Sequence, residues 1–309
     1  MRTGIGLAAV ASCVALVAAV AVGRDGGGSA SRFTPPKGPY VALGDSYTAG
    51  PKIPGQHGRP AGCERSDRNY PALVAAGLGL RAAEFRDISC SGAVMADLSA
   101  PQSTDHGVNP AQFSALNTAT RLVTLGIGGN DIGFGSLITT CVRSGVGYQL
   151  EKRIGGGTAD RAPCRSRYLS DGTDEVEAKI KAAGGRLTGV LAGIRHRAPK
   201  ARIYVVGYPA ILPAEGTDCT AMGLAPGDVE FLRDKERQLN AVLREKARAA
   251  GAGYVDTYAP STGRDACADP DVRWVEPLFP AAPAAPAHPN ERGERGMADA
   301  VLRTVGAAD

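Results

Sequence analysis

The fold prediction rests on the stretch Val41-Ala-Leu-Gly-Asp-Ser-Tyr-Thr-Ala-Gly50. It joins an apolar run ending at Leu43 to a turn of small residues around Ser46. A continuous apolar run predicts a strand that is covered on both faces. Ser46 then lies at the carboxyl end of the strand, where open α/β sheets bind ligands. Because Gly-Asp-Ser is also an ordinary turn sequence, the role of the serine depends on the rest of the chain.

Apolar, β-rich runs alternate with amphipathic segments along the chain, which predicts an α/β fold with a parallel sheet. The expected strands are residues 39–45, 83–89, 121–127, 202–208 and 253–258. The expected helices are residues 69–78, 174–196 and 228–250, whose apolar stripes are interpreted as core faces. Segment 136–171, rich in Gly, Ser and Arg, is predicted to be a disulfide-pinned excursion. The Pro- and Ala-rich segment 277–289 is predicted to be an irregular loop.

The N-terminal residues indicate export. Residues 1–23 contain Arg2 followed by an apolar run, which is typical of a secretory signal peptide. An uncleaved membrane anchor and a lipoprotein signal before Cys13 are the alternatives, in that order of preference. Residues 24–37 are interpreted as a flexible linker, and residues 38–309 as a single domain.

The cysteines fit an exported chain. Six remain after the N-terminal segment, and an even number in an exported protein predicts three disulfides. Among the possible pairings we favour the one that follows chain order: Cys63–Cys90, Cys141–Cys164 and Cys219–Cys267. A zinc site is disfavoured, because the sequence has no Cys-x-x-Cys motif.

Composition narrows the class of protein. Of 309 residues, 43% are hydrophobic and 21% are charged, as in a globular domain with a full core. The net charge of +4 is too small and too dispersed to indicate a nucleic-acid partner. We expect a monomer.

Three further motifs follow predicted strands or stand near the C-terminus. They are Ser89-Cys-Ser-Gly-Ala93, Gly128-Gly-Asn-Asp131 and Ala287-His-Pro-Asn290. Loops after parallel strands meet at one edge of the sheet, so Ser46, Gly92 and Asn130 are expected to converge there. A late loop could bring His288 to the same place.

This set of residue types suits acyl transfer. A serine is a weak nucleophile until a base accepts its proton, and a neutral histidine can do so near pH 7. The oxyanion of the tetrahedral intermediate needs fixed donors. The backbone N–H groups of Ser46 and Gly92 and the side-chain amide of Asn130 would supply three.

The four blocks, in this order, resemble the SGNH/GDSL hydrolase family, particularly its secreted lipase and esterase branch from actinobacteria. The resemblance covers residues 38–305. It implies a three-layer, flavodoxin-like α/β fold with a five-stranded parallel sheet. It also implies Ser46 as nucleophile, His288 as base, and an oxyanion hole made by Ser46, Gly92 and Asn130. The six paired cysteines are similar to those of the secreted branch.

Two positions depart from the family pattern. Tyr47 replaces a leucine, a change expected to be harmless. Ala285 stands where the family usually has the aspartate that orients the histidine. Our hypothesis is a Ser46–His288 dyad in which the main-chain oxygen of Ala285, or of a near neighbour, accepts the Nδ1 proton. The carboxylates of Glu276 and Glu291 are rival acceptors.

Other ionisable residues near the motifs receive structural interpretations. Asp45 is expected to brace the turn around Ser46, and Asp131 is treated likewise. His57, His106 and His196 are expected at the surface.

The expected function is therefore that of a secreted serine esterase or lipase acting on carboxylic, lipid-like esters, without a cofactor or metal. Its partners would be a small ester or lipid substrate and, transiently, a lipid interface. One alternative is a polysaccharide O-deacetylase, although the aromatic content of 5% offers few sugar-stacking platforms. Another is a catalytically inactive binding module on the same fold.

Overall fold

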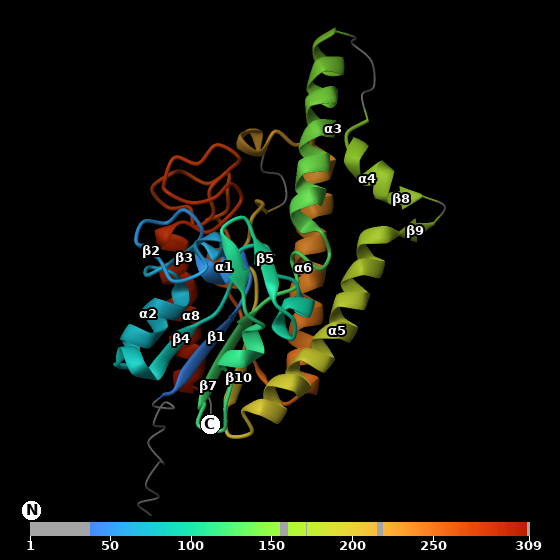
Figure 1. The fold of residues 1–309 in the computed structure, drawn as a ribbon. Helices are drawn as coiled ribbons and strands as arrows, with labels where there is room; N and C mark the ends of the chain where they lie inside the picture. Colours follow the sequence, from blue (N-terminus) through green and yellow to red (C-terminus); the bar gives the residue numbers. More distant parts are fainter. Residues whose placement is uncertain (1–37, 155–159, 171, 215–218, 308–309) are drawn as a thin grey trace, which may run out of the picture. The chain divides into compact units, whose positions relative to one another are not determined.

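The fold is built on one central parallel sheet (Figure 1). The computed structural model describes residues 38–154, 160–170, 172–214 and 219–307. The predicted signal segment 1–23 and linker 24–37 lie outside them. The five strands are β1 (Tyr40–Gly44), β4 (Phe85–Asp87), β7 (Leu122–Gly126), β10 (Arg202–Val206) and β11 (Gly253–Val255). They lie in the order β4-β1-β7-β10-β11, which is the flavodoxin-like order, so the predicted fold is confirmed.

Side chains on β1 alternate between two hydrophobic cores, as the period of a strand requires. Tyr40 and Ala42 belong to the smaller core, whereas Val41 and Leu43 belong to the larger one. Both sets are buried, which explains why the strand is an unbroken apolar run.

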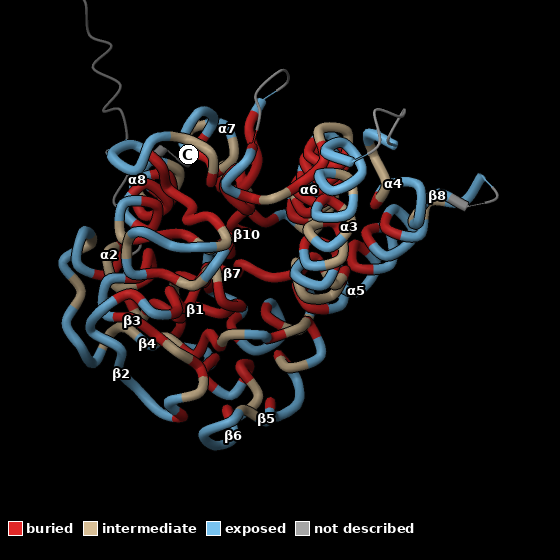
Figure 2. Tube along the Cα trace, turned by 90° about the horizontal axis from the view of Figure 1, so that it is seen from above, coloured by how far each residue is buried: buried red, intermediate tan, exposed pale blue. Residues whose placement is uncertain are grey.

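Helices cover both faces of the sheet (Figures 1 and 2). The smaller core lies under α2 (Tyr70–Gly77) and α8 (Glu291–Ala307), and α8 was not predicted. The larger core lies under α5 (Glu175–Arg197) and α6 (Pro226–Ala249). Asn69 and Asp174 cap α2 and α5 by accepting a backbone N–H, which fixes where these helices begin.

The prediction for segment 136–171 was incomplete. Most of its first half belongs to a 21-residue helix, α3 (Phe134–Ile154), which extends past the carboxyl edge of the sheet (Figure 1). Gly145 weakens the helical propensity of this segment, but it lets the helix lie directly against the backbone of residues 223–225. A Cβ at Gly145 would lie 2.2 Å from the carbonyl oxygen of Gly223. Tertiary packing therefore overrides local propensity here.

The remaining α-helices and β-strands of the described residues are short. They are α1 (Ser46–Ala49), β2 (Gln56–His57), β3 (Arg65–Ser66), β5 (Gln102–Thr104), β6 (Gly107–Asn109), α4 (Pro163–Tyr168), β8 (Leu169–Ser170), β9 (Thr173–Asp174) and α7 (Tyr258–Ser261). Segment 277–289 is irregular, as predicted. The structure contains the three disulfides in chain order, Cys63–Cys90, Cys141–Cys164 and Cys219–Cys267.

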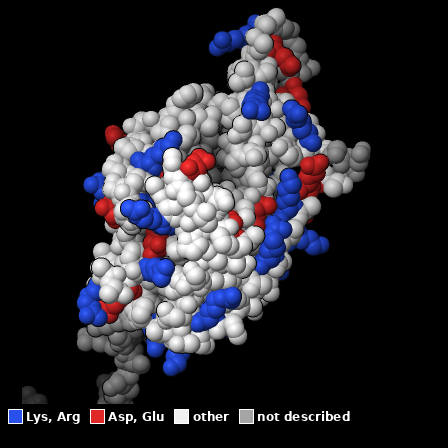
Figure 3. Space-filling view, in the orientation of Figure 1, with Lys and Arg blue, Asp and Glu red and all other residues white. Residues whose placement is uncertain are grey.

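Charged side chains are interspersed over the body of the domain, as the space-filling view of one face shows (Figure 3). Within the described residues, no helix has the length and apolar character needed to cross a bilayer.

Candidate active site

Ser46 is the first residue of α1, directly after β1. Asp45 precedes it as the N-cap, and its Oδ1 accepts the backbone N–H of Tyr47 at 3.0 Å. The backbone N–H of Asp45 donates to the carbonyl oxygen of Gly126 on β7 at 2.9 Å. Asp45 thus braces the turn, as expected. Ser46 lies where the strand order reverses between β1 and β7, the ligand-binding place in this class of sheet.

His288 reaches Ser46 from the far end of the chain. Its Nε2 lies 2.8 Å from Ser46 Oγ, and its Nδ1 lies 2.7 Å from the carbonyl oxygen of Pro286. A carbonyl oxygen can only accept, so Nδ1 carries the ring proton. Nε2 is then the acceptor for the hydroxyl of Ser46. This is the tautomer that a general base needs.

A main-chain carbonyl orients the ring, as expected, but it is that of the neighbouring Pro286 and not that of Ala285. The carbonyl oxygen of Ala285 instead accepts the backbone N–H of His288 at 3.2 Å, which closes a turn over residues 285–288. Within that turn Ala287 has a positive φ of 57°. The next carbonyl, that of Pro286, is therefore the one that meets the ring.

Neither rival carboxylate contacts His288. Glu276 is fully buried and accepts hydrogen bonds from Arg273, from Asn290 and from two backbone N–H groups of the 277–289 loop. Its backbone also pairs with this loop, through Ala287 and His288. Glu291 instead pairs with Arg68 and Arg295. Glu276 thus holds the shape of the loop that carries the histidine.

Two of the expected oxyanion donors, Ser46 and Asn130, line the same cavity, whereas Gly92 lies outside its wall. The side-chain nitrogen of Asn130 donates one hydrogen to the carbonyl oxygen of Ala93 at 2.9 Å, which leaves its second hydrogen available. This bond ties Asn130 to the residue after Gly92. Gly92 has a φ of 78°, a conformation that favours glycine, and it is exposed beside the cavity rather than in its wall.

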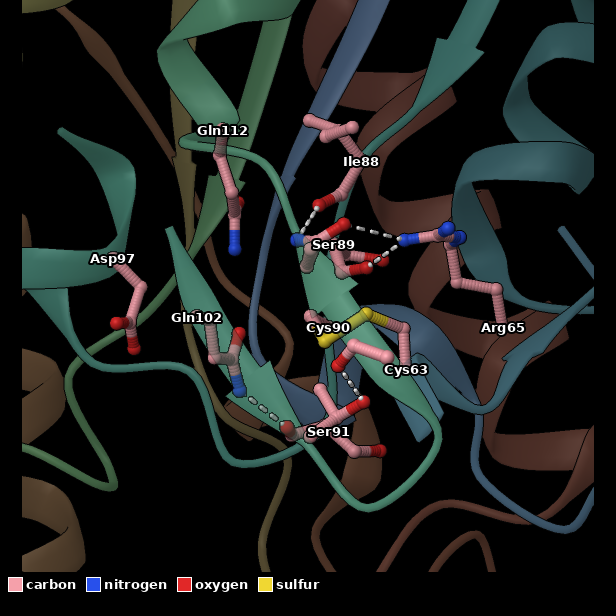
Figure 4. The surroundings of a disulfide bond; sticks show 12 residues. Cys63, Arg65, Ile88, Ser89, Cys90, Ser91, Asp97, Gln102 and Gln112 are labelled. Atoms are coloured by element: carbon pink, nitrogen blue, oxygen red, sulfur yellow. Dashed lines mark hydrogen bonds between the residues drawn. A yellow bond between two sulfur atoms is a disulfide. The ribbon is translucent and has the colours of Figure 1, made fainter. Parts of the chain in front are cut away.

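The loop that carries Gly92 is firmly held (Figure 4). The Cys63–Cys90 disulfide joins it to the β2–β3 region. Buried Arg65 donates to the carbonyl oxygen of Ser89 at 2.7 Å, and Gln102 donates to that of Ser91 at 2.8 Å. A fixed loop lets a backbone donor act without rearrangement.

Removal of this disulfide is expected to destabilise the protein. The double variant Cys63→Ser/Cys90→Ser opens a loop whose ends are 27 residues apart, which corresponds to about 3–4 kcal/mol in the chain-entropy model. We expect a lower midpoint of urea unfolding. Loss of Cys141–Cys164, with ends 23 residues apart, should cost a similar amount but leave kcat unchanged. Removal of Cys63–Cys90 should also lower kcat, because this disulfide holds the loop that carries Gly92. Equal losses of kcat in the two double variants would contradict this specific role.

Two tyrosines to which the sequence analysis gave no role connect the motifs. The hydroxyl of Tyr208, after β10, accepts the backbone N–H of Gly129 at 2.8 Å and donates to Asp45 Oδ2 at 2.6 Å. The hydroxyl of Tyr47 donates to the carbonyl oxygen of Ala287. The Tyr47 ring also lies 4.8 Å from that of His288, centroid to centroid. Tyr47, which stands where the family has a leucine, therefore contacts the loop that carries the histidine.

A cavity of about 350 Å³ opens beside Ser46 and His288, within the usual range for small-molecule sites. Its wall is mainly apolar and aromatic. The wall includes Tyr47, Phe134, Ile138, Tyr208, Ile211, Leu239 and Leu278, with Asn130 and the carboxyl of Glu236 as polar groups. Burial raises the pKa of Glu236 well above its usual range, which favours the uncharged form of this carboxyl in the wall.

Burial also shifts the ionisation of the groups around the serine. It lowers the pKa of His288 from 6.5, against the opposing effect of the Pro286 carbonyl. It raises the pKa of Asp45 to about 7, although hydrogen bonds from Tyr208 and the Tyr47 backbone favour the carboxylate. His288 is therefore neutral at pH 7 and able to accept a proton.

The other candidate residues have structural positions. Asp131 accepts the backbone N–H of Met95 at 3.0 Å and pairs with Arg186 at 3.2 Å, as a structural role predicts. His57, His106 and His196 are exposed. In the part of the chain that the structure describes, no group of three or more His, Cys, Asp or Glu side chains could hold a metal ion.

Comparison with known proteins agrees with this geometry. The model of the GDSL-like lipase/acylhydrolase family matches residues 42–295. The chain belongs to this family. It is a carboxylic ester hydrolase.

Relatives of this hydrolase are known from Streptomyces. It is 41% identical to Lipase 2 of Streptomyces coelicolor, over 77% of this chain and 76% of that protein. Among solved structures, it is similar to phospholipase A1 from Streptomyces albidoflavus, with 29% identity and a TM-score of 0.69. That match covers 88% of this chain and all of the other. An extracellular lipase from Streptomyces rimosus gives a TM-score of 0.67 at 28% identity, over 86% and 98% of the two chains.

Proposed function

We propose that the protein is a secreted serine esterase or lipase that cleaves lipid-like carboxylic esters through an acyl-enzyme. Ser46 Oγ attacks the acyl carbonyl while His288 Nε2 takes its proton. The resulting imidazolium is stabilised by the Pro286 carbonyl and then protonates the leaving alcohol. Water, activated by the same nitrogen, attacks the acyl-enzyme and releases the acid.

The observation that carries this proposal is the hydrogen-bonded line Ser46 Oγ, His288 Nε2, His288 Nδ1 and Pro286 oxygen, with distances of 2.8 and 2.7 Å. A carbonyl dipole replaces the carboxylate of a triad, so the imidazolium gains less electrostatic stabilisation. The oxyanion would be bound by the backbone N–H of Ser46, that of Gly92, and the free hydrogen on Asn130.

The mainly apolar wall of the cavity is an argument for substrates whose acyl chains are longer than acetyl. Apolar wall on both α3 and the β10–α6 side would bury methylene groups, each stabilising by about 0.8 kcal/mol. The names of the relatives, which include lipases and a phospholipase A1, point the same way.

A hydrolysis series tests this proposal. With p-nitrophenyl esters from acetate to dodecanoate, kcat/KM should rise with chain length until the cavity is filled. Covalent labelling by a fluorophosphonate should occur and be lost in Ser46→Ala. Activity restricted to acetyl esters, above all acetylated glycans, would favour a deacetylase. Absence of labelling and of hydrolysis would favour an inactive binding module.

Export is also part of the proposal. Residues 1–23 have the composition of a signal peptide, and three disulfides persist in oxidising compartments. Mass spectrometry of the protein in culture medium would locate the N-terminus. An intact N-terminus in the membrane fraction would instead indicate an anchor.

The pH dependence should report the lowered pKa of His288. Because the neutral ring is the active form, kcat/KM should rise with pH and level off, with a midpoint below 6.5. A stopped assay with a soluble ester measures this. A midpoint near 7 would instead assign the limb to Asp45, whose pKa is about 7, and Asp45→Asn would then remove it.

Tyr47→Phe tests the contact between the serine turn and the histidine loop. The variant keeps the ring against His288 but loses the hydrogen bond to the Ala287 carbonyl. We expect kcat to fall about fivefold, the equivalent of about 1 kcal/mol, with KM nearly unchanged. Tyr254→Phe, which removes a hydroxyl that bonds to Asn240 and belongs to a residue outside the cavity wall, is the control. Equal losses in the two variants would contradict a role for Tyr47 in positioning His288.

A further inference from the structure

The outer half of α3 has an unusual surface. Val146, Leu150 and Ile154 follow one another at intervals of four residues, so they form one ridge of the helix. Their exposed fractions are 63%, 56% and 76%. Single exposed apolar residues are common and need no explanation. Three in one row, on a helix end that extends past the sheet, are not accounted for by packing (Figure 1).

The same ridge begins in the wall of the cavity. Ile138 lines the cavity, Val142 is partly buried against the core, and the exposed row continues from there. The row from Ile138 to Ile154 is about 24 Å long at the helical rise. It forms an apolar path between the cavity and the end of the helix. Phe279, which is 88% exposed, follows the cavity-lining Leu278 in the loop before His288.

Basic residues are concentrated in the segment that carries the outer half of this ridge and in the segment that follows it. Residues 143–168 contain six Arg or Lys and two Asp or Glu, a net charge of +4, which equals the net charge of the whole chain. The rest of the chain is therefore neutral overall. The basic residues are Arg143, Lys152, Arg153, Arg161, Arg165 and Arg167, all exposed. Some of them lie on α4, which the Cys141–Cys164 disulfide joins to α3.

We infer that the outer half of α3 together with α4, called here the α3–α4 arm, is a docking surface for an anionic phospholipid bilayer. An apolar ridge flanked by basic side chains is the pattern of a helix that lies in a membrane interface. Each Arg or Lys near an anionic surface adds about a fivefold increase in affinity. The ridge would lead an ester from the bilayer toward Ser46, and this part of the inference rests on the proposed function.

Vesicle binding tests the arm separately from catalysis. The secreted form of the chain carrying Ser46→Ala, which leaves the lipid intact, is sedimented with vesicles of phosphatidylcholine, with and without phosphatidylglycerol. Binding should be stronger with phosphatidylglycerol and should weaken as salt is raised. Lys152→Glu/Arg153→Glu should lower the partition coefficient at least about 30-fold on anionic vesicles. Leu150→Ser/Ile154→Ser should lower it at least about tenfold.

Matched controls lie away from the arm. Val108→Ser removes an equally exposed apolar side chain, 60% exposed, on the β5–β6 hairpin. Lys200→Glu reverses an exposed charge before β10, at the edge of the sheet opposite Ser46. Neither should change binding by more than about twofold. Equal losses in controls and arm variants, or no preference for phosphatidylglycerol, would overturn the inference.

Two further readouts separate this inference from others. If Leu150→Ser abolishes a concentration-dependent dimer without changing vesicle binding, the ridge covers a second copy and the inference is wrong. Soluble p-nitrophenyl esters, assayed with Ser46 restored, should be hydrolysed equally by arm variants and wild type. Hydrolysis without vesicle binding would overturn only the inference that the α3–α4 arm binds a bilayer. Vesicle binding without hydrolysis would overturn the proposed function and leave the arm as a lipid-binding surface.

Discussion

His288→Ala is expected to lower kcat for a soluble ester by about 10⁴- to 10⁶-fold, and Ser46→Ala by a similar factor. The two atoms that exchange the proton lie 2.8 Å apart, and a serine without its base is protonated and inert. KM should change little, because the acyl chain is held mainly by apolar wall. Initial rates with p-nitrophenyl butyrate, corrected for the uncatalysed reaction, measure both effects.

The double variant Ser46→Ala/His288→Ala distinguishes a functional unit from two separate contributions. Residues that act together show strongly non-additive losses, so the double variant should be no slower than the worse single variant. Glu276→Gln serves as the comparison, since Glu276 supports the histidine loop without touching the ring. If Glu276→Gln lost as much kcat as His288→Ala at unchanged stability, a carboxylate rather than the Pro286 carbonyl would orient the histidine.

The sheet could be predicted from sequence because its strands are buried on both faces. Runs such as 121–127 and 202–208 lack polar residues at alternate positions, and the structure shows why: the neighbours Leu122 and Val123 face different cores. The first residues of helices could also be predicted where an N-cap residue fixes them, as at Asn69 and Asp174. These signals are local, so they need no knowledge of the fold.

The failures concern features fixed by distant contacts. The α3 helix is stabilised by a disulfide and by the approach of Gly145 to residue 223, neither of which affects local periodicity. The choice of Pro286 over Ala285 follows from a positive φ at Ala287, a residue that seldom adopts one. Each is a property of the assembled chain.

The site was predictable in its members but not in its supports. Ser46, His288 and Asn130 were identified from motifs, and the structure brings them to one cavity. Gln112 makes two hydrogen bonds to the backbone of Gly44 across 68 residues, and Tyr208 joins two motifs across 79 and 163 residues. Nothing in the sequence near either residue signals these contacts. Supports of this kind can be found only from coordinates.

Asn130→Ala is expected to lower kcat about 100- to 1,000-fold, the usual consequence of losing one oxyanion donor. KM should stay within about threefold, because the oxyanion forms only in the transition state. The difficulty is that the same side chain also holds the Gly92 loop through Ala93. A loss of kcat could therefore come from a displaced loop instead of a missing donor.

Gln102→Ala resolves that difficulty. Its amide supports the same loop through the Ser91 carbonyl at 2.8 Å, yet Gln102 is not part of the cavity wall. If the loop alone matters, the two variants should lose equal amounts of kcat. If Asn130 donates to the oxyanion, Gln102→Ala should lower kcat less than about tenfold, as expected for one neutral hydrogen bond.

Asn130→Asp adds a second criterion, since it preserves the shape of the side chain, removes both donors and places negative charge where the oxyanion develops. It should therefore be slower than Asn130→Ala, and a faster rate would contradict the placement of the Asn130 amide at the oxyanion.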